Sequence, residues 1–214
     1  MASDQPVTAL VYNKDTKSEY VVEECVLRQM ATLRQMLDMM NEGSMTATTE
    51  ERVIPISALD EWSKSEYINV HDLYDTAFKF AKLVYDQRDE EWSAKSIKQI
   101  IHEEFRPPPT QALEEMISGL CSKMEITDFH ARKRMTVEYL LGLCIVFNHL
   151  EFQRGHDLVT MMVADMVRNA DERSIFRLFG IEREITEEER RQVYHDNPWL
   201  GVYPGDQSRA VATK

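Results

Sequence analysis

Histidine and cysteine are the side chains in this chain that could ligate a metal ion or act as a nucleophile. His149 and His156 are seven positions apart, so they share a face only if one helix runs through both, and we expect Gly155 to break that helix. Cys144 lies within the most apolar stretch of the sequence, where a thiol packs and does not form an exposed thiolate. The spacing therefore predicts no metal ligands and no catalytic cysteine.

Acidic clusters and glycine-rich loops are the other patterns that could carry catalysis. Glu187, Glu188 and Glu189 follow Thr186, and this is the arrangement of a capping box at the start of a helix. The chain has neither G-x-G-x-x-G nor Gly-Lys-Ser/Thr, so no loop is predicted to cradle phosphates. We predict a protein that is not an enzyme and that needs no cofactor.

Composition narrows the class of partner. The chain has 214 residues, with 37 acidic and 25 basic side chains and a formal charge of −12, which disfavours nucleic-acid binding. No apolar run approaches the ~20 residues of a membrane span. Three widely spaced cysteines and residues 1–10, which lack the features of a secretory leader, lead us to expect a cytoplasmic and nuclear protein with protein partners.

The N-terminal part has the pattern of a small mixed sheet with helices. Alternating β-branched residues predict strands over residues 7–12 and 20–22, and a short apolar run predicts a third over 52–56. Helical spacing predicts one amphipathic helix over 23–43 and a second that Asn69 caps. The stripe of the second helix is Val70, Leu73, Tyr74, Ala77, Ala81 and Val84.

Residues 86–128 differ from their surroundings because they are charged and contain Pro107-Pro108-Pro109. We expect an inserted linker with an extended polyproline piece between two short helical stretches, residues 96–105 and 111–124. Each stretch has an apolar stripe too short to be stable alone. The stripes must pack either on the chain's own domain, which we favour, or on a partner chain.

The C-terminal half is predicted to be helical. Residues 136–149 are apolar almost all round, which is typical of a helix at the centre of a core. A second helix is expected over 158–167, and Asp171 is placed to cap a third that ends at Gly180. Residues 201–214 lack an apolar period and are expected to be disordered.

The last of these helices carry a resemblance to a known family. Residues 181–200 read IEREITEEERRQVYHDNPWL, and this resembles the end of the Skp family of adaptors, in which Thr, three acidic residues, Gln-Val and an acidic-Asn-x-Trp ending recur. Residues 147–152 are similar to the family's Asn-Tyr-Leu-Asp-Ile segment, and residues 157–181 continue in register. Residues 28–37 and 54–56 resemble the family's first helix and the strand that follows it.

The resemblance implies an α/β (α+β) fold, namely a BTB/POZ-like domain with a small three-stranded sheet over residues 5–152, followed by a helical dimerisation and F-box-binding region over 153–200. It implies a non-catalytic adaptor of an SCF-type ubiquitin ligase that joins F-box proteins to a cullin. Homodimer formation is a further expectation. The alternative is a diverged Skp-like assembly module that no longer binds cullin.

The resemblance also implies two contact surfaces. Candidate F-box contacts are the apolar residues of the last helices, Val163, Met166, Val167, Ile175, Phe179, Ile181, Ile185, Val193 and Trp199. Their alternative role is a self-contained helical core. Candidate cullin contacts are Phe147, Asn148 and His149, at the end of the central helix. Asn148 has the alternative role of capping that helix.

The sequence departs from the family pattern in four places, which favours a diverged paralogue. His149 stands where the family has Tyr, and Gly155 with His156 replaces a Leu-Leu pair. A loop that contains Trp62 is inserted, and the 86–128 segment is longer than in the family. An interface aromatic can contribute over ~1–2 kcal/mol to binding, so the change at His149 bears directly on cullin affinity.

Overall fold

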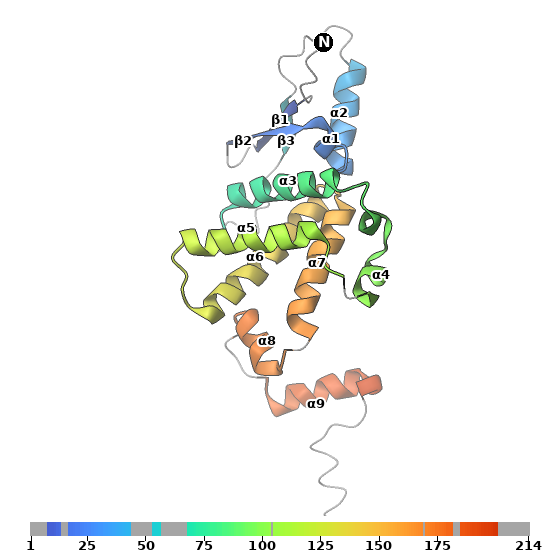
Figure 1. The fold of residues 1–214 in the computed structure, drawn as a ribbon. Coiled ribbons are helices and arrows are strands. Elements are labelled where there is room, and N and C mark those ends of the chain that lie inside the picture. Colours follow the sequence, from blue (N-terminus) through green and yellow to red (C-terminus); the bar gives the residue numbers. More distant parts are fainter. Residues whose placement is uncertain are drawn as a thin grey trace, which may run out of the picture. The chain divides into compact units, whose positions relative to one another are not determined.

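The computed structural model describes residues 8–13, 17–43, 53–56, 68–103, 105–168, 170–181 and 185–200. The predicted 44–51 loop, the Trp62 loop and the 201–214 tail lie outside the described residues. The chain forms two compact units, Met1–Phe179 and Gly180–Lys214 (Figure 1).

A three-stranded mixed sheet forms the N-terminal part of the first unit. β1 (Thr8–Asn13) pairs antiparallel with β2 (Ser18–Glu23) and parallel with β3 (Val53–Ile56), in the order β2-β1-β3. Alternate residues face the core, and Val11 and Ile54 are fully buried. The predicted strands and the α+β fold class are thus confirmed, in agreement with a BTB/POZ-like arrangement.

The single helix predicted over residues 23–43 is wrong, because the structure divides it. α1 (Glu24–Leu27) ends in a turn, and α2 (Ala31–Gly43) begins after it. The turn buries Met30 completely, and the Ala31 N–H donates to the Glu151 carbonyl at 3.4 Å. Contacts with a distant part of the chain therefore determine this break, which periodicity alone could not reveal.

The helix α3 (Val70–Asp86) lies against the sheet (Figure 1). The Asn69 side chain accepts from the His71 N–H at 2.9 Å, so the predicted cap is confirmed. The whole predicted stripe of α3 is buried. Tyr20 of β2 packs against the ring of Phe78 with 5.4 Å between centroids, so aromatic contacts join the sheet to the helical layer.

Residues 86–128 fold into η2 (Glu91–Ala94), α4 (Ile97–His102) and α5 (Pro108–Lys123). The expected extended polyproline piece is wrong, because Pro108 and Pro109 form the first turn of α5. Proline is favoured there, since the first turn of a helix needs no N–H donor and φ is already helical.

The apolar stripes of this segment pack on the chain's own core. Ile100, Leu113 and Ile117 are at most 1% exposed and belong to the same cluster as the β-strands and α3. The preferred of the two packing predictions is therefore confirmed.

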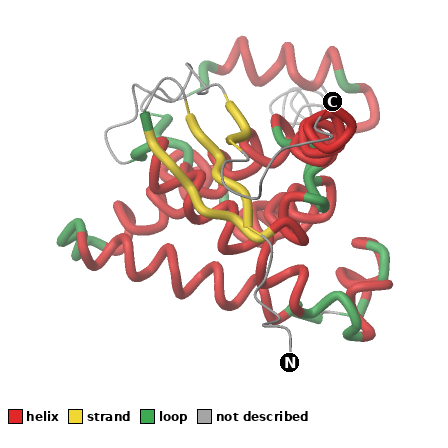
Figure 2. Tube along the Cα trace, turned by 90° about the horizontal axis from the view of Figure 1, so that it is seen from above, coloured by secondary structure: helices red, strands yellow, loops and turns green. Residues whose placement is uncertain are grey.

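The central helix α6 (Phe129–His149) is followed by α7 (Gln153–Arg168) and α8 (Glu172–Leu178). Figure 2, seen from above, shows the three strands in front of helices of the first unit. The predicted break at Gly155 is wrong in position, because Gly155 lies inside α7 and the chain turns at Glu151, which has a φ of 54°.

The second unit contains α9 (Glu187–Asp196) and η3 (Pro198–Leu200). Thr186 accepts from the Glu189 N–H at 3.2 Å, and the Glu189 carboxylate accepts from the Thr186 N–H at 2.9 Å. The predicted capping box is confirmed. None of the described residues of α9 is buried, so local hydrogen bonds hold this helix.

Candidate functional site

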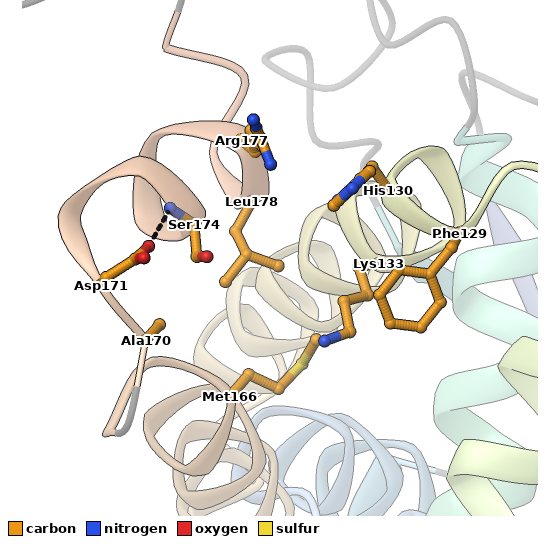
Figure 3. A pocket seen from close by; sticks show the side chains of 9 residues that line it. All are labelled: Phe129, His130, Lys133, Met166, Ala170, Asp171, Ser174, Arg177 and Leu178. Carbon is orange, nitrogen blue, oxygen red and sulfur yellow. Dashed lines mark hydrogen bonds between the residues drawn. The ribbon is translucent and has the colours of Figure 1, made fainter.

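A pocket of about 440 Å³ opens between the start of α6, the end of α7 and α8 (Figure 3). We call it the α6–α8 pocket. Leu178 is 7% exposed and contributes apolar surface together with Met166, while the Phe129 ring is 61% exposed. The remaining lining residues are His130, Lys133, Ala170, Asp171, Ser174 and Arg177. The pocket is thus apolar in part and bordered by charged side chains.

Helix capping positions two sides of the α6–α8 pocket. Asp128 accepts from the Ala131 N–H at 2.8 Å and so starts α6, which brings Phe129 into the wall. Asp171 accepts from the Ser174 N–H at 2.7 Å and starts α8, as predicted (Figure 3). This hydrogen bond, with nearby cations, lowers the pKa of the Asp171 carboxyl, so the cap is ionised at neutral pH.

The α6–α8 pocket contains serine, histidine and aspartate side chains, so we compared their geometry with that of a hydrolytic triad. Asp171 bonds the Ser174 backbone, and it does not bond His130. A triad needs the acid to orient the histidine and the histidine to bond the nucleophile. These described residues therefore form a capped helix beside a binding pocket, which suits an apolar side chain of a partner protein.

The positively charged side chain of Lys133 lies over the Phe129 ring, with its Nζ 4.5 Å from the ring centroid. This cation–π contact brings the Lys133 side chain to the ring, and Phe129 remains 61% exposed. An exposed aromatic beside a half-buried methionine is the kind of surface that binding partners cover.

The predicted F-box residues fall into two groups. Met166 lines the α6–α8 pocket, with Val163, Val167 and Ile175 partly buried on α7 and α8 and Phe179 39% exposed. The second unit carries the others, which are all exposed: Ile181, Ile185, Val193 and Trp199 at 46%, 37%, 47% and 79%. The first group lies near the pocket, and the second presents a separate exposed apolar set.

Sequence reasoning missed Phe129, Lys133 and Leu178. The predicted helix began at residue 136, because Arg132, Lys133 and Arg134 interrupt the apolar run. The signal that marks the true start is Asp128, a residue type favoured at the N-cap, which here accepts from the N–H of Ala131, the third residue of α6.

The last turn of α6 packs against the start of α7. Phe147 is fully buried and packs edge-on against Phe152 with 5.3 Å between ring centroids. Asn148 is exposed and His149 is partly exposed. The Asn148 carbonyl accepts from the Glu151 N–H at 3.2 Å, so the backbone closes the helix and leaves the Asn148 side chain outside.

The end of α6 is also hydrogen-bonded to α2, since the Thr32 hydroxyl donates to the His149 carbonyl at 3.3 Å. This bond fixes the backbone beneath His149 and Asn148. The candidate cullin contacts therefore lie on a rigid support, with Phe147 beneath them.

Cys144, His149 and His156 were the other side chains that could have been catalytic or metal-binding, and their surroundings favour neither role. Burial raises the pKa of the Cys144 thiol, which keeps it protonated at neutral pH. His149 and His156 lie on different helices. Within the described ranges, no three His, Cys, Asp or Glu side chains converge on a common point for a metal ion, and no helix is long and apolar enough to cross a membrane.

A model of a known protein family matches the C-terminal segment of the chain. Residues 156–200 match the model described as Skp1 family, dimerisation domain. No curated protein matches the chain. The matched residues include α8, α9 and most of α7, and all nine predicted F-box contacts fall inside them. The match confirms the resemblance that this segment shows in the sequence and supports a Skp1-family protein.

Proposed function

We propose that the chain is a non-catalytic adaptor of an SCF-type ubiquitin ligase, which binds an F-box receptor through its C-terminal helices and a cullin through the end of α6. The observation that carries the proposal is the coincidence of two features. Residues 156–200 match the Skp1 family dimerisation domain. The same residues carry Met166 and Leu178, which line the α6–α8 pocket, and exposed apolar side chains, namely Phe179 in the first unit and Ile181, Ile185, Val193 and Trp199 in the second.

The physical argument starts from exposed apolar surface. Phe129, Phe179 and Trp199 are 61%, 39% and 79% exposed, and a partner that covers them removes apolar area from water at about 25 cal/mol per Å². Aromatic anchors of this kind contribute most of the binding energy at protein interfaces. Phe129 and Phe179 belong to the first unit and Trp199 to the second, and a receptor helix with an apolar face is the kind of partner that covers such side chains in either unit.

The first experiment is affinity purification of the full chain from its own cells, with mass spectrometry of the proteins that co-purify. F-box proteins and a cullin are the expected partners. Trp199→Ala should weaken F-box binding by ~2 kcal/mol or more and leave the melting temperature unchanged, because Trp199 is 79% exposed. Val21→Ala is the matched control, since Val21 is 74% exposed on β2. Unchanged F-box binding by the Trp199 variant would show that Trp199 is not an F-box contact.

A second candidate function is an assembly module that binds F-box proteins but no cullin. It is favoured by His149, which stands where the family has Tyr and is only partly exposed. The two functions differ in one measurement. Changing Asn148 and His149 together to Lys should abolish cullin association and spare F-box binding if the chain is a full adaptor. If the wild-type chain recovers F-box proteins without cullin, the chain is an assembly module. In that case the surface at Asn148 and His149 no longer binds a cullin.

A further inference from the structure

The turn that joins α5 to α6 lies at the edge of the first unit (Figure 1). Residues 122–125 of this turn are exposed. The Glu125 N–H donates to the Ser122 carbonyl at 3.1 Å, and the Ile126 N–H donates to the Cys121 carbonyl at 3.0 Å. The turn is therefore accessible to a modifying enzyme, and its backbone hydrogen bonds give a local measure of its stability.

The Ser122 hydroxyl faces a positively charged side chain. The Arg132 Nη2 donates to the Ser122 Oγ at 3.2 Å, and the Ser122 hydroxyl donates to the Ser118 carbonyl at 3.0 Å. Arg132 is the fourth residue of α6, and within the described part of the chain it forms no ion pair. Its guanidinium therefore has further donors for a stronger acceptor at the position of Ser122.

The residues after Ser122 match the pattern that acidic-directed Ser/Thr kinases recognise, in which an acidic residue follows three positions after the modified one. Among the described serines and threonines, only Ser122 and Thr186 have this neighbour, Glu125 and Glu189. The Thr186 hydroxyl is bonded to the Glu189 carboxylate at 3.0 Å, so a phosphate there would meet a like charge. At Ser122 the phosphate would meet the Arg132 guanidinium instead.

We propose that Ser122 is a phosphorylation site whose phosphate is bound by Arg132, so that the modification fixes the turn from α5 to α6. In the transfer, the Ser122 oxygen bonds to the γ-phosphorus of ATP as the bond from this phosphorus to the β–γ bridging oxygen breaks. ADP leaves, and the hydroxyl proton passes to the catalytic base of the kinase. Neither the modification nor its effect on the turn requires an F-box or cullin partner.

A phosphate on Ser122 forms a stronger link between the two helices than the hydroxyl does. It carries a charge of about −1.5 to −2 and supplies acceptor oxygens, which a guanidinium binds in pairs. The anion lies in the last turn of α5, where the helix dipole opposes it, so the contact with Arg132 decides the sign of the effect. Phe129 and Lys133, which line the α6–α8 pocket, neighbour Arg132 on α6. The phosphate thus fixes the helical turn that forms one wall of this pocket.

The first test locates the phosphate. The full chain is treated with casein kinase 2 and ATP, the chain is also purified from its own cells, and both samples are mapped by mass spectrometry. Phosphate is expected on Ser122, and Glu125→Gln should slow its incorporation by the kinase. Ser118→Ala is the matched control, because Ser118 is an exposed serine one turn earlier in α5 with Cys121 three positions after it, and this variant should be phosphorylated like the wild type. Absence of phosphate from Ser122 in both samples would overturn the assignment.

The second test measures the link to Arg132 by hydrogen exchange in the full chain before and after kinase treatment. Exchange at the Glu125, Ile126 and Arg132 amides, which are hydrogen-bonded at this turn, should slow about fivefold on phosphorylation. Arg132→Gln keeps the recognition pattern and should lose this slowing. Arg134→Gln is the control, because the Arg134 Nε donates to Glu138 at 2.9 Å, and it should retain the slowing. No slowing in the wild type, or equal slowing in the Arg132 variant, would refute the role of the phosphate.

Discussion

The central helix α6 and the C-terminal helix α9 both begin at a side-chain cap, yet they are held by different forces. Asp128 caps α6, and eight residues of α6 are buried. Thr186 caps α9 through a capping box, and no described residue of α9 is buried. The first helix is stabilised by packing and the second by local hydrogen bonds. Val193 of α9 is consequently 47% exposed and available to a partner, whereas the buried side chains of α6 are committed to the core.

The core packing that stabilises α6 is also close at its turn into α7. A Cβ added at Gly155 would lie 2.4 Å from the Phe152 ring. The Phe152 ring therefore fills the space that a side chain at position 155 would need.

The largest expected effect is therefore that of Gly155→Ala. Phe152 is 2% exposed and packed edge-on against Phe147, so its ring has no room to move. Overpacking of this kind costs about 1–3 kcal/mol, and we expect the upper end in urea unfolding. Gly119→Ala in α5 is the matched control, because no atom lies within 4 Å of the added Cβ. The control should stabilise the protein by about 0.5–1 kcal/mol. Equal effects at the two glycines would show that the turn is not tightly packed.

The next effect concerns a buried hydrogen-bond pair in the core. The Tyr139 hydroxyl lies 2.8 Å from the Thr76 hydroxyl and donates to the Asp72 carbonyl at 2.9 Å. Tyr139→Phe removes both of these hydrogen bonds and should lower the free energy of unfolding by about 1–2 kcal/mol. In a double-mutant cycle, Thr76→Val should cost less in the Tyr139→Phe background than alone. Strict additivity would mean that the pair does not interact.

A smaller and local effect is expected in α9. Thr186→Ala removes the capping box and should reduce helix stability by about 1 kcal/mol. Because α9 has no buried residue in its described range, helical circular dichroism should fall while the main cooperative transition keeps its midpoint. Glu188→Ala, which leaves the box intact, is the control. A lowered midpoint for Thr186→Ala would show that α9 packs on the core, and it would contradict the difference drawn between α9 and α6.

The smallest effect is the pH response of α8. The pKa of Asp171 is lowered chiefly because its carboxylate accepts the Ser174 N–H. A lowered pKa in the folded state means that the ionised group stabilises α8 above its ordinary pKa, and that this stabilisation is lost as pH falls through the lowered value. NMR titration of the α8 amides from about pH 5 to about pH 2 should show this loss. Asp171→Asn, which caps without a charge, should remove the pH dependence.

Local signals account for what the sequence predicted well. Asn69, Asp171 and Thr186 each cap the helix expected from them, because a cap depends on residues only two or three positions apart. The α1–α2 break and the true site of the α6–α7 turn were missed. Both depend on contacts between distant segments, such as the bond from Ala31 to Glu151.

The candidate site was predicted only in part for the same reason. Met166 was expected from its place on an apolar helix face, and it lines the α6–α8 pocket. Phe129 and Leu178 come from other helices, and only the tertiary fold brings them beside it. Whether each predicted F-box or cullin residue contacts a partner stays a prediction for the binding experiments above.

The strand order β2-β1-β3 has a consequence for the order of folding events. β1 pairs with β2 across a short turn, whereas its parallel pairing with β3 joins Leu10 to Val53. Long-range pairings are slow, because the intervening chain must lose its entropy before the contacts form. The β1–β2 hairpin and the α6–α7 pair, which turns within a few residues, should therefore form early, and addition of β3 should complete the sheet late. In a folding-rate study, Ile54→Val should accelerate unfolding with little change in the folding rate.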